Sequence, residues 1–233
     1  MADQPRFERA LIVGAGTGLS ASLARRFARE GLAVTLAART LDKLEAVRAE
    51  TGARVVACDA TAPDQVARLF ADLDAAGGAP DLVVYNAGSG GRGPFVDLDP
   101  AVVERSLGSA FGAFLVAQEA AKRMLPKRQG AILFTGASAS VKGYPRSSPF
   151  AMGKFALRGL AQSLARELSP QGVHVGHFVI DGGIRNPGRL EPPDRPDSML
   201  DPDAIADAYW RLVTQPRSAW TWEVELRPWV ETF

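Results

Sequence analysis

The sequence has little cysteine, no excess of charge and no long apolar run, and each shortage excludes a class of protein. A single cysteine, Cys58, excludes an internal disulfide and fits a reducing compartment, so we interpret it as a buried thiol. With 27 basic and 26 acidic residues the formal net charge is +1, which gives no electrostatic reason to bind nucleic acid or an anionic membrane. Small molecules are therefore the expected partners.

The first residues also lack a targeting pattern. The apolar run in MADQPRFERALIVGAG is short and continues into glycines, and no stretch approaches the roughly 18 apolar residues of a membrane helix. We expect a cytoplasmic protein. Its two histidines, His174 and His177, lie three residues apart in a strand pattern and so face opposite sides, which argues against a shared metal site. We predict structural histidines and no metal centre.

What the sequence does contain is apolar residues in an alternating order. Of its 233 residues, 46% are hydrophobic, which supplies one sizeable core, so we predict a single domain over 1–233. Short β-rich runs alternate with longer segments of helical periodicity, which indicates a parallel sheet with helices on both faces. The predicted strands are 9–13, 33–38, 53–58, 82–85, 131–135, 173–180 and 221–226. The predicted helices are 20–31, 41–50, 63–76, 99–125, 147–172 and 203–215.

The stretch 181–203, DGGIRNPGRLEPPDRPDSMLDPD, departs from this alternation. It is rich in proline, glycine and charge and too long for an ordinary connection, which is typical of a functional lid or a disordered linker. Ligands of such sheets lie beyond the carboxyl ends of the strands, and this stretch directly follows a strand. We therefore favour a substrate lid at about 183–200.

A glycine-rich turn, GAGTGLS, follows the first predicted strand and opens the next helix. Gly14, Gly16 and Gly18 permit positive φ and let backbone N–H groups approach a pyrophosphate at the helix N-terminus, where the dipole favours negative charge. Glycine turns are common, but the position of this one within a βαβ unit indicates a dinucleotide site.

Arg39 follows the second predicted strand, where NAD sites place a carboxylate for the ribose 2′-OH. An arginine there instead accommodates the 2′-phosphate of NADP. Arg39 therefore favours NADP, with NAD the less expected cofactor; the alternative is a solvated surface arginine.

Together with three further motifs, these residues resemble the short-chain dehydrogenase/reductase superfamily over nearly the whole chain. The further motifs are Asp59-Ala60 after the third strand, YNAG at 85–88, and DGGIRNP at 181–187. The resemblance implies a Rossmann-type, doubly wound, predominantly parallel seven-stranded sheet. It also implies an NADP site formed by Gly14, Gly16, Thr17, Gly18, Leu19, Arg39, Asp59, Ala60, Asn86, Ala87, Gly88, Lys154, Gly182 and Ile184.

Some letters of these cofactor motifs depart from the family pattern. Ser20 stands for the last glycine of the turn, and Tyr85 for the first asparagine of the strand-four motif. Asp181 stands for a proline and Asn186 for a threonine in the last motif.

The catalytic positions depart further. In the superfamily that the chain resembles, four residues share the chemistry. Asparagine supports a water relay, serine orients the carbonyl or alcohol, tyrosine moves the proton, and lysine holds the ribose and lowers the tyrosine pKa. Alignment places Ser109, Ala137 and Phe150 at the first three positions, and only Lys154 matches. A shift of one residue would recover Ser138, although neighbouring side chains on a strand face opposite ways.

Loss of a general acid costs about 10²–10⁴ in rate, which weakens hydride transfer without abolishing it. Substitutes for the tyrosine are available in Tyr144, Ser147, Ser148 and Asp181. Tyr144 is the best by chemistry, because an ammonium near a phenol lowers its pKa; the alternative is a loop tyrosine without a role. The predicted catalytic residues are Ser138, Tyr144 and Lys154.

Two functions follow from the resemblance. One is an NADP-dependent oxidoreductase that interconverts carbonyl and alcohol on a small or medium apolar substrate with altered acid/base residues. The other is an NADP-binding protein with vestigial catalysis and a sensing or scaffolding role. The resemblance also implies a homodimer or homotetramer, because such proteins commonly pair the helices corresponding to 99–125 and 147–172 with those of another subunit.

Overall fold

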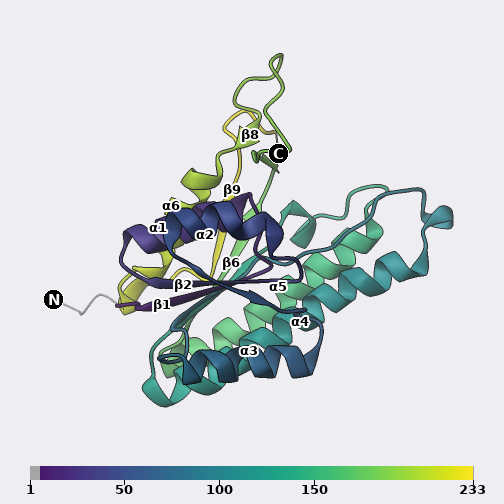
Figure 1. Cartoon of the computed structure of the whole chain (residues 1–233). Coiled ribbons are helices and arrows are strands. Elements are labelled where there is room, and N and C mark those ends of the chain that lie inside the picture. Colours follow the sequence, from purple (N-terminus) through teal and green to yellow (C-terminus); the bar gives the residue numbers. More distant parts are fainter. Residues whose placement is uncertain (1–5, 233) are drawn as a thin grey trace.

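The computed structural model of the chain describes residues 6–232, and its centre is one sheet of seven parallel strands (Figure 1). The strands are β1 (Arg9–Val13), β2 (Ala33–Ala38), β3 (Arg54–Ala57), β4 (Leu82–Tyr85), β5 (Ala131–Thr135), β6 (His174–Ile180) and β9 (Glu223–Leu226). Their order is β3-β2-β1-β4-β5-β6-β9, so the direction of winding reverses between β1 and β4. The predicted doubly wound, Rossmann-type sheet is confirmed. Residues 1–5 and 233 of the predicted domain lie outside the described residues.

Six α-helices of the described chain cover the two faces of this sheet. They are α1 (Leu19–Arg29), α2 (Glu45–Thr51), α3 (Pro63–Ala75), α4 (Pro100–Met124), α5 (Ser148–Leu168) and α6 (Pro202–Val213). Figure 1 shows α1, α2 and α6 on one face and α3, α4 and α5 on the other. None of the helices described between residues 6 and 232 is long and apolar enough to cross a membrane.

The alternation of side chains along each strand divides the core into two layers. In β1, Ile12 faces the layer that contains Phe27 of α1, and Leu11 faces the layer that contains Phe70 of α3. All four side chains are fully buried. Burial of one such side chain stabilises the fold by about 1.5–3 kcal/mol, so both faces of the sheet contribute to holding the strand ends in place.

The last four residues of the predicted stretch 147–172, SPQG, are a stop signal, and helix α5 ends just before them. It ends at Leu168, and Ser169–Gln171 form a turn of 3₁₀ helix. Gly172 then adopts the left-handed conformation with a φ of 89°, which stops the helix. The start is unaffected, so Phe150 and Lys154 lie one turn apart near the amino end of α5, as predicted.

The segment predicted as a lid contains a small parallel ladder that the sequence did not predict. β7 (Gly183–Ile184) pairs with β8 (Met199–Leu200), so the two ends of the segment are held together. Between them the chain projects away from the carboxyl edge of the sheet (Figure 1). Two residues per strand are too few to give a periodic pattern, which is why sequence reasoning found only an irregular stretch.

Candidate functional site

The turn at 14–18 joins the carboxyl end of β1 to α1. Gly14 has a φ of 82°, and a Cβ built on it would lie 2.4 Å from the backbone N of Ala87, so no other residue fits. In the described helix α1, neither a capping side chain nor an acidic residue of the first turn satisfies the N–H groups that follow Gly18. Free donors at the positive end of a helix dipole suit a pyrophosphate. The residues present therefore fit the phosphates of a dinucleotide.

A cleft of about 780 Å³ opens at the carboxyl ends of β1 to β4. Sites for small molecules typically measure roughly 300–1,000 Å³, so its size is appropriate for a nucleotide. The predicted cofactor residues in its wall are Gly14, Arg39, Asp59, Ala60, Asn86, Ala87 and Gly88. Residues from four separate strand ends are thus brought to one surface, as the topology requires.

The remaining predicted cofactor residues do not line this cleft themselves. Gly16, Thr17 and Leu19 belong to the turn and the first residue of α1. A Cβ built on Gly18 would lie 3.3 Å from the Cβ of Asn186, so the turn touches the segment that follows β6. Gly182 and Ile184 precede this contact point in that segment.

The rim of the cleft beyond β2 is cationic. Arg39 and Lys43 both line it and both are exposed. Across the cleft, Asp59 accepts hydrogen bonds from the backbone N and the hydroxyl of Thr61, over 3.0 and 2.8 Å. These bonds, with the charge of Arg39, hold the pKa of Asp59 below its ordinary value. Because the Asp59 carboxylate is already bonded to Thr61, the cations of Arg39 and Lys43 are available to bind the 2′-phosphate that distinguishes NADP from NAD.

Lys154 occupies the inner end of the site. Its Nζ donates a 2.7 Å hydrogen bond to the carbonyl O of Thr135, and burial lowers its pKa to about 8. It lines a small cavity of about 10 Å³, the space of roughly one water molecule, with Ser106 and Ser109 among the other walls. Ala87, Gly88, Ser89 and Ser109 line both this cavity and the large cleft. Lys154 therefore stands where the two spaces meet.

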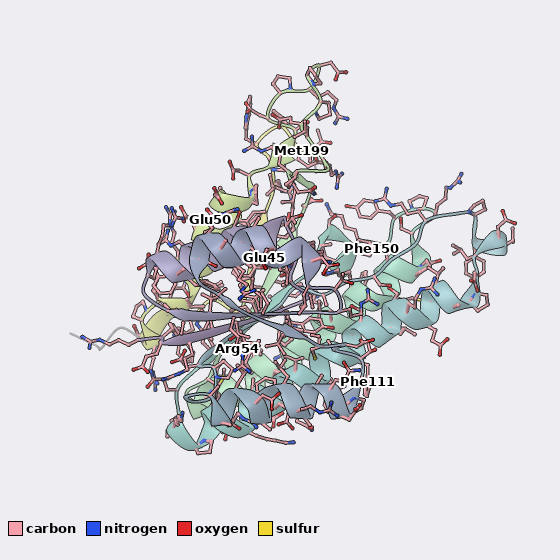
Figure 2. All side chains as sticks on the ribbon, in the orientation of Figure 1. Glu45, Glu50, Arg54, Phe111, Phe150 and Met199 are labelled. Carbon is pink, nitrogen blue, oxygen red and sulfur yellow. The ribbon has the colours of Figure 1, made fainter. Side chains whose placement is uncertain are left out.

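Phe150 lies on the same face of α5, one turn before Lys154. Its ring centroid is 5.8 Å from the Lys154 Nζ. A Cβ built on Gly90 would lie 2.6 Å from the Phe150 Cδ2, so the ring packs directly on the backbone of the loop after β4. Figure 2 shows Phe150 near the amino end of α5. The predicted tyrosine position is thus filled by a packed ring that has no proton to exchange.

The hydroxyl groups predicted near the catalytic lysine are distributed unevenly. Ser109 on α4 reaches the site, where its Oγ donates to the carbonyl O of Ala87 over 3.3 Å. Ser138 begins the short 3₁₀ helix η4 (Ser138–Ser140), is half-buried, and makes no side-chain hydrogen bond within residues 6–232. Ser140 is fully buried and its Oγ accepts from the backbone N of Ala137. The structure leaves Ser138 free to bond a ligand, but outside the walls of both cavities.

The predicted substitutes for tyrosine also differ in position. Tyr144 is 40% exposed, and its hydroxyl forms no hydrogen bond with any residue the structure describes. Ser147 is buried and Ser148 half-buried at the start of α5. Asp181 is buried at the end of β6, with its carboxylate 3.5 Å from Lys142 and 3.5 Å from Arg227. None of these side chains is brought against Lys154 by a described contact.

His177, for which the sequence predicts only a structural role, belongs to a polar cluster with Glu223 and Arg158. His177 of β6 is fully buried, and its Nδ1 lies 3.0 Å from the Glu223 carboxylate of β9. Arg158 of α5 donates two hydrogen bonds to the same carboxylate, over 2.6 and 2.8 Å. Burial lowers the pKa of His177 to about 4, against the opposing effect of Glu223. The signal in the sequence was the pair of glutamates, Glu223 and Glu225, in the last strand.

Sequence reasoning also missed why two motif departures are tolerated. The hydroxyl of Tyr85 donates a 2.7 Å hydrogen bond to the carbonyl O of Ser109, and burial raises its pKa. Ser20 is buried, and its Oγ accepts a 2.7 Å hydrogen bond from the Asn86 side chain. Each departure therefore supplies a bond between two walls of the site. Within the described residues, no group of three or more His, Cys, Asp or Glu is placed to hold a metal ion.

The chain is similar in sequence and in fold to several known proteins. A sequence model described as short chain dehydrogenase matches residues 8–186. A solved short-chain dehydrogenase from Rhodopseudomonas palustris is 37% identical, with a TM-score of 0.81 over 97% of this chain and 100% of that one. A metagenomic short-chain oxidoreductase solved in complex with NADP is 28% identical, with a TM-score of 0.83 over 96% and 98% of the two chains. The (+)-borneol dehydrogenase 1 of Salvia officinalis is 34% identical over 185 residues, 75% of this chain and 70% of that protein.

Proposed function

Because the chain belongs to the short-chain dehydrogenase family, we propose that it is an NADP-dependent oxidoreductase that interconverts carbonyl and alcohol on a small or medium apolar substrate. The observation that carries the proposal is the cleft at the carboxyl ends of β1 to β4, with uncapped donors of α1 on one side and a cationic rim on the other. A bound nicotinamide would supply or accept the hydride. The chain itself has to bind, orient and exchange a proton.

The binding roles follow from the position of each group. The backbone N–H groups after Gly18 would bind the pyrophosphate, and Arg39 with Lys43 would bind the 2′-phosphate. The buried end of the site would take the ribose next to the nicotinamide, where the Lys154 ammonium can donate to its hydroxyls. The metagenomic relative solved with NADP supports this cofactor over NAD.

The apolar character of the substrate rests on the side chains at the far end of the site. Phe150 packs against Gly90 one turn from Lys154, and Leu190 in the 183–200 segment is 79% exposed. We treat 183–200 as a lid whose closure would cover the substrate and bury Leu190. The sage relative is named for borneol, an apolar alcohol, which agrees with such a wall.

The alternative is an NADP-binding protein without turnover that acts as a sensor or scaffold. One observation favours it: Phe150 is packed on Gly90 where a tyrosine would move the proton. Ala137 and Ser109 at two further catalytic positions point the same way. Both functions require NADPH binding, so binding alone does not separate them.

Turnover separates them. NADPH consumption would be measured with a panel of apolar aldehydes, ketones and diketones, with native protein and Phe150→Tyr side by side. The proposal expects the native chain to reduce at least one class of carbonyl, with Phe150→Tyr changing the rate and not creating it. Activity confined to Phe150→Tyr would support the vestigial alternative. Failure of the native chain to bind NADPH in a fluorescence titration would contradict both.

We also propose that two copies pair through the outer face of α4 and α5. Phe114 of α4 and Met152 and Phe155 of α5 are 43%, 45% and 46% exposed, which is unusual for large apolar side chains on neighbouring helices. Phe111, whose ring stacks on that of Phe114 with centroids 6.4 Å apart, lies in the helix layer in Figure 2. It also lines the cofactor cleft. A second copy would cover this face, which agrees with the expected dimer or tetramer.

A further inference from the structure

Reduction of a carbonyl needs a proton as well as a hydride, and Phe150 has none to give. We propose that Lys154 itself donates this proton to the carbonyl oxygen, so that it is the catalytic acid of this protein in addition to a cofactor ligand. The inference rests on the proposed function and names the group that replaces the tyrosine.

The other ionisable groups near the site either have partners of their own or make no described side-chain contact with Lys154. The Tyr85 hydroxyl is buried and donates to the carbonyl of Ser109. The Asp181 carboxylate is buried between Lys142 and Arg227. Tyr144 is a partly exposed loop residue whose hydroxyl makes no hydrogen bond among the described residues. Among the described residues that line the small cavity at the inner end of the cleft, Lys154 alone is ionisable.

The Nζ of Lys154 has protons to spare and open space in front of it. Of the three ammonium protons, one is used in the bond to the Thr135 carbonyl. A Cβ built on Gly88 would lie 3.4 Å from Nζ, so the glycine leaves this side of the ammonium open. On the other side the Phe150 ring lies 5.8 Å away. Without a tyrosine hydroxyl, a carbonyl oxygen or one water molecule can occupy the space beside Nζ.

The acidity of Lys154 suits this role. A general acid works best when its pKa lies near the operating pH, and an ordinary lysine, at about 10.4, is too weak an acid. Burial lowers the pKa of Lys154 to about 8. The ammonium is therefore mostly protonated at neutral pH and yet able to release its proton.

The charges around Lys154 leave this titration undisturbed at neutral pH. His177 of β6 faces the same interior and is neutral above about pH 4. Arg158 of α5 and Glu223 of β9 neutralise each other through two hydrogen bonds. On the cleft side, Glu104 and Arg105 of α4 carry opposite charges.

The step balances with these groups alone. The hydride from the reduced nicotinamide forms a C–H bond at the carbonyl carbon, and the C=O π electrons move to the oxygen. That oxygen takes a proton from the Lys154 ammonium, directly or across one water, which leaves an alcohol, the oxidised nicotinamide and a neutral amine. The amine regains a proton from solvent through the cleft. Alcohol oxidation uses the same groups in reverse, with the neutral amine as base.

The first test measures Lys154 without turnover. Lysine side chains labelled with ¹³C and ¹⁵N would be titrated by NMR, free and with NADP, and the Lys154 signal assigned by its loss in Lys154→Met. We expect this ammonium to titrate near pH 8. A Lys154 pKa at the ordinary value near 10.4 would overturn the inference and leave the proposed function standing.

The second test is the pH profile of kcat at saturating cofactor in both directions. Reduction should fall as pH rises through the NMR value, and oxidation should rise over the same interval. Lys154→Arg, which stays protonated, should slow reduction about 10²–10⁴-fold and lose this titration. Phe150→Tyr should change the pH at which the rate of reduction falls, because a phenol takes over the proton transfer. Lys127→Met is the matched control, since Lys127 is an exposed lysine beyond the end of α4.

The outcomes separate the two proposals. A limb near pH 8 that persists in Lys154→Arg, or a native profile that is flat from pH 7 to 9, refutes Lys154 as the acid while turnover still supports an oxidoreductase. NADPH binding without turnover on any carbonyl contradicts both. NADPH affinity of each variant would be measured separately, so that weakened cofactor binding is not mistaken for a lost acid.

Discussion

The side-chain amide of Asn86 donates a 2.7 Å hydrogen bond to the buried hydroxyl of Ser20, and that hydroxyl donates in turn to the carbonyl of Gly14 over 3.3 Å. This pair joins the end of β4 to the first turn of α1 and to the glycine-rich turn. A serine at a position where the resembling family has glycine is therefore part of the wall of the cofactor site.

Ser20→Ala and Ser20→Gly should both destabilise the protein. Removal of the hydroxyl leaves the Asn86 amide without its partner, at a cost of about 1–3 kcal/mol, and glycine adds roughly 1 kcal/mol within a helix. Denaturant unfolding measures the loss. Ser22→Ala is the matched control, because Ser22 is also buried on α1 but its hydroxyl makes no bond in the part of the chain that the structure describes. Full stability of Ser20→Gly would contradict the role of the hydroxyl.

Arg39→Asp should shift cofactor preference from NADPH to NADH. A charge-assisted bond to the 2′-phosphate contributes about 1.5–3 kcal/mol, so NADPH affinity should fall roughly 10- to 100-fold, while the new carboxylate can accept from a ribose 2′-OH. Fluorescence titration with both cofactors measures the shift. Arg48→Asp makes the same change of charge on α2, where Arg48 pairs with Glu45, and should leave the preference unchanged. Equal effects of the two variants would remove Arg39 from the site.

Phe114→Glu with Phe155→Glu should convert a dimer or tetramer to a monomer. The two substitutions place carboxylates on the proposed apolar interface of α4 and α5. Association would remove these charges from water, and this desolvation opposes it. Light scattering after size exclusion measures the mass. Phe95→Glu is the control, since Phe95 is 80% exposed in the short helix η2 (Phe95–Asp97) and not on this face. A native protein that is already monomeric at micromolar concentration would sink the pairing.

The free energy of unfolding should fall as pH drops from about 6.5 to about 4. In the unfolded chain His177 takes up a proton near its ordinary pKa of 6.5, whereas in the fold it stays neutral until about 4. Between these values the unfolded state binds more protons, so stability falls as the solution is acidified. The contribution is about 3–4 kcal/mol at most, because the two pKa values differ by about 2.5 units and one unit corresponds to about 1.4 kcal/mol.

His177→Asn removes this titration and keeps a side chain that can donate to Glu223. Urea unfolding at a series of pH values should therefore show a shallower slope in the variant between pH 6.5 and 4. The remaining slope belongs to His174, whose pKa burial also lowers, and to carboxylates such as Glu223. Identical slopes in variant and native protein would show that His177 does not titrate in this interval.

The order of strands and helices could be predicted from the sequence because it depends on local signals. Strand-like runs such as RALIV and AVTLAA and the glycines that follow several of the helices, such as Gly31 and Gly52, are visible without any tertiary contact. The ladder of β7 and β8 could not be predicted, since each strand has two residues and exists only because the ends of the 183–200 segment meet. The end of α5 at Leu168, in contrast, is set by the turn SPQG at 169–172, whose proline and glycine are visible in the sequence.

The residues of the candidate site also fall into those that local patterns predict and those that depend on tertiary contacts. The cofactor residues could be placed because each follows a predicted strand, and strand ends of a parallel sheet share one edge. Lys154 could also be placed, because it lies on a predicted helix, whereas the positions of Ser138 and Tyr144 depend on where loops turn: Ser138 lies in a 3₁₀ helix and Tyr144 on an exposed loop. The contact of Phe150 with Gly90 joins segments far apart in sequence and has no pattern of its own.

The edge strand β9 has a consequence for how the protein folds. Glu223 meets His177 and Arg158 across 46 and 65 positions of the sequence, so this edge closes only after a long segment has been ordered. Contacts of such separation form late, because the entropy of loop closure comes before the stabilising bonds. We expect β9 to dock after β1, β2 and β3, whose pairings span 24 and 19 positions of the sequence (Arg9 with Ala33, Thr35 with Arg54), and to exchange its amide hydrogens earlier than β1 and β2 do.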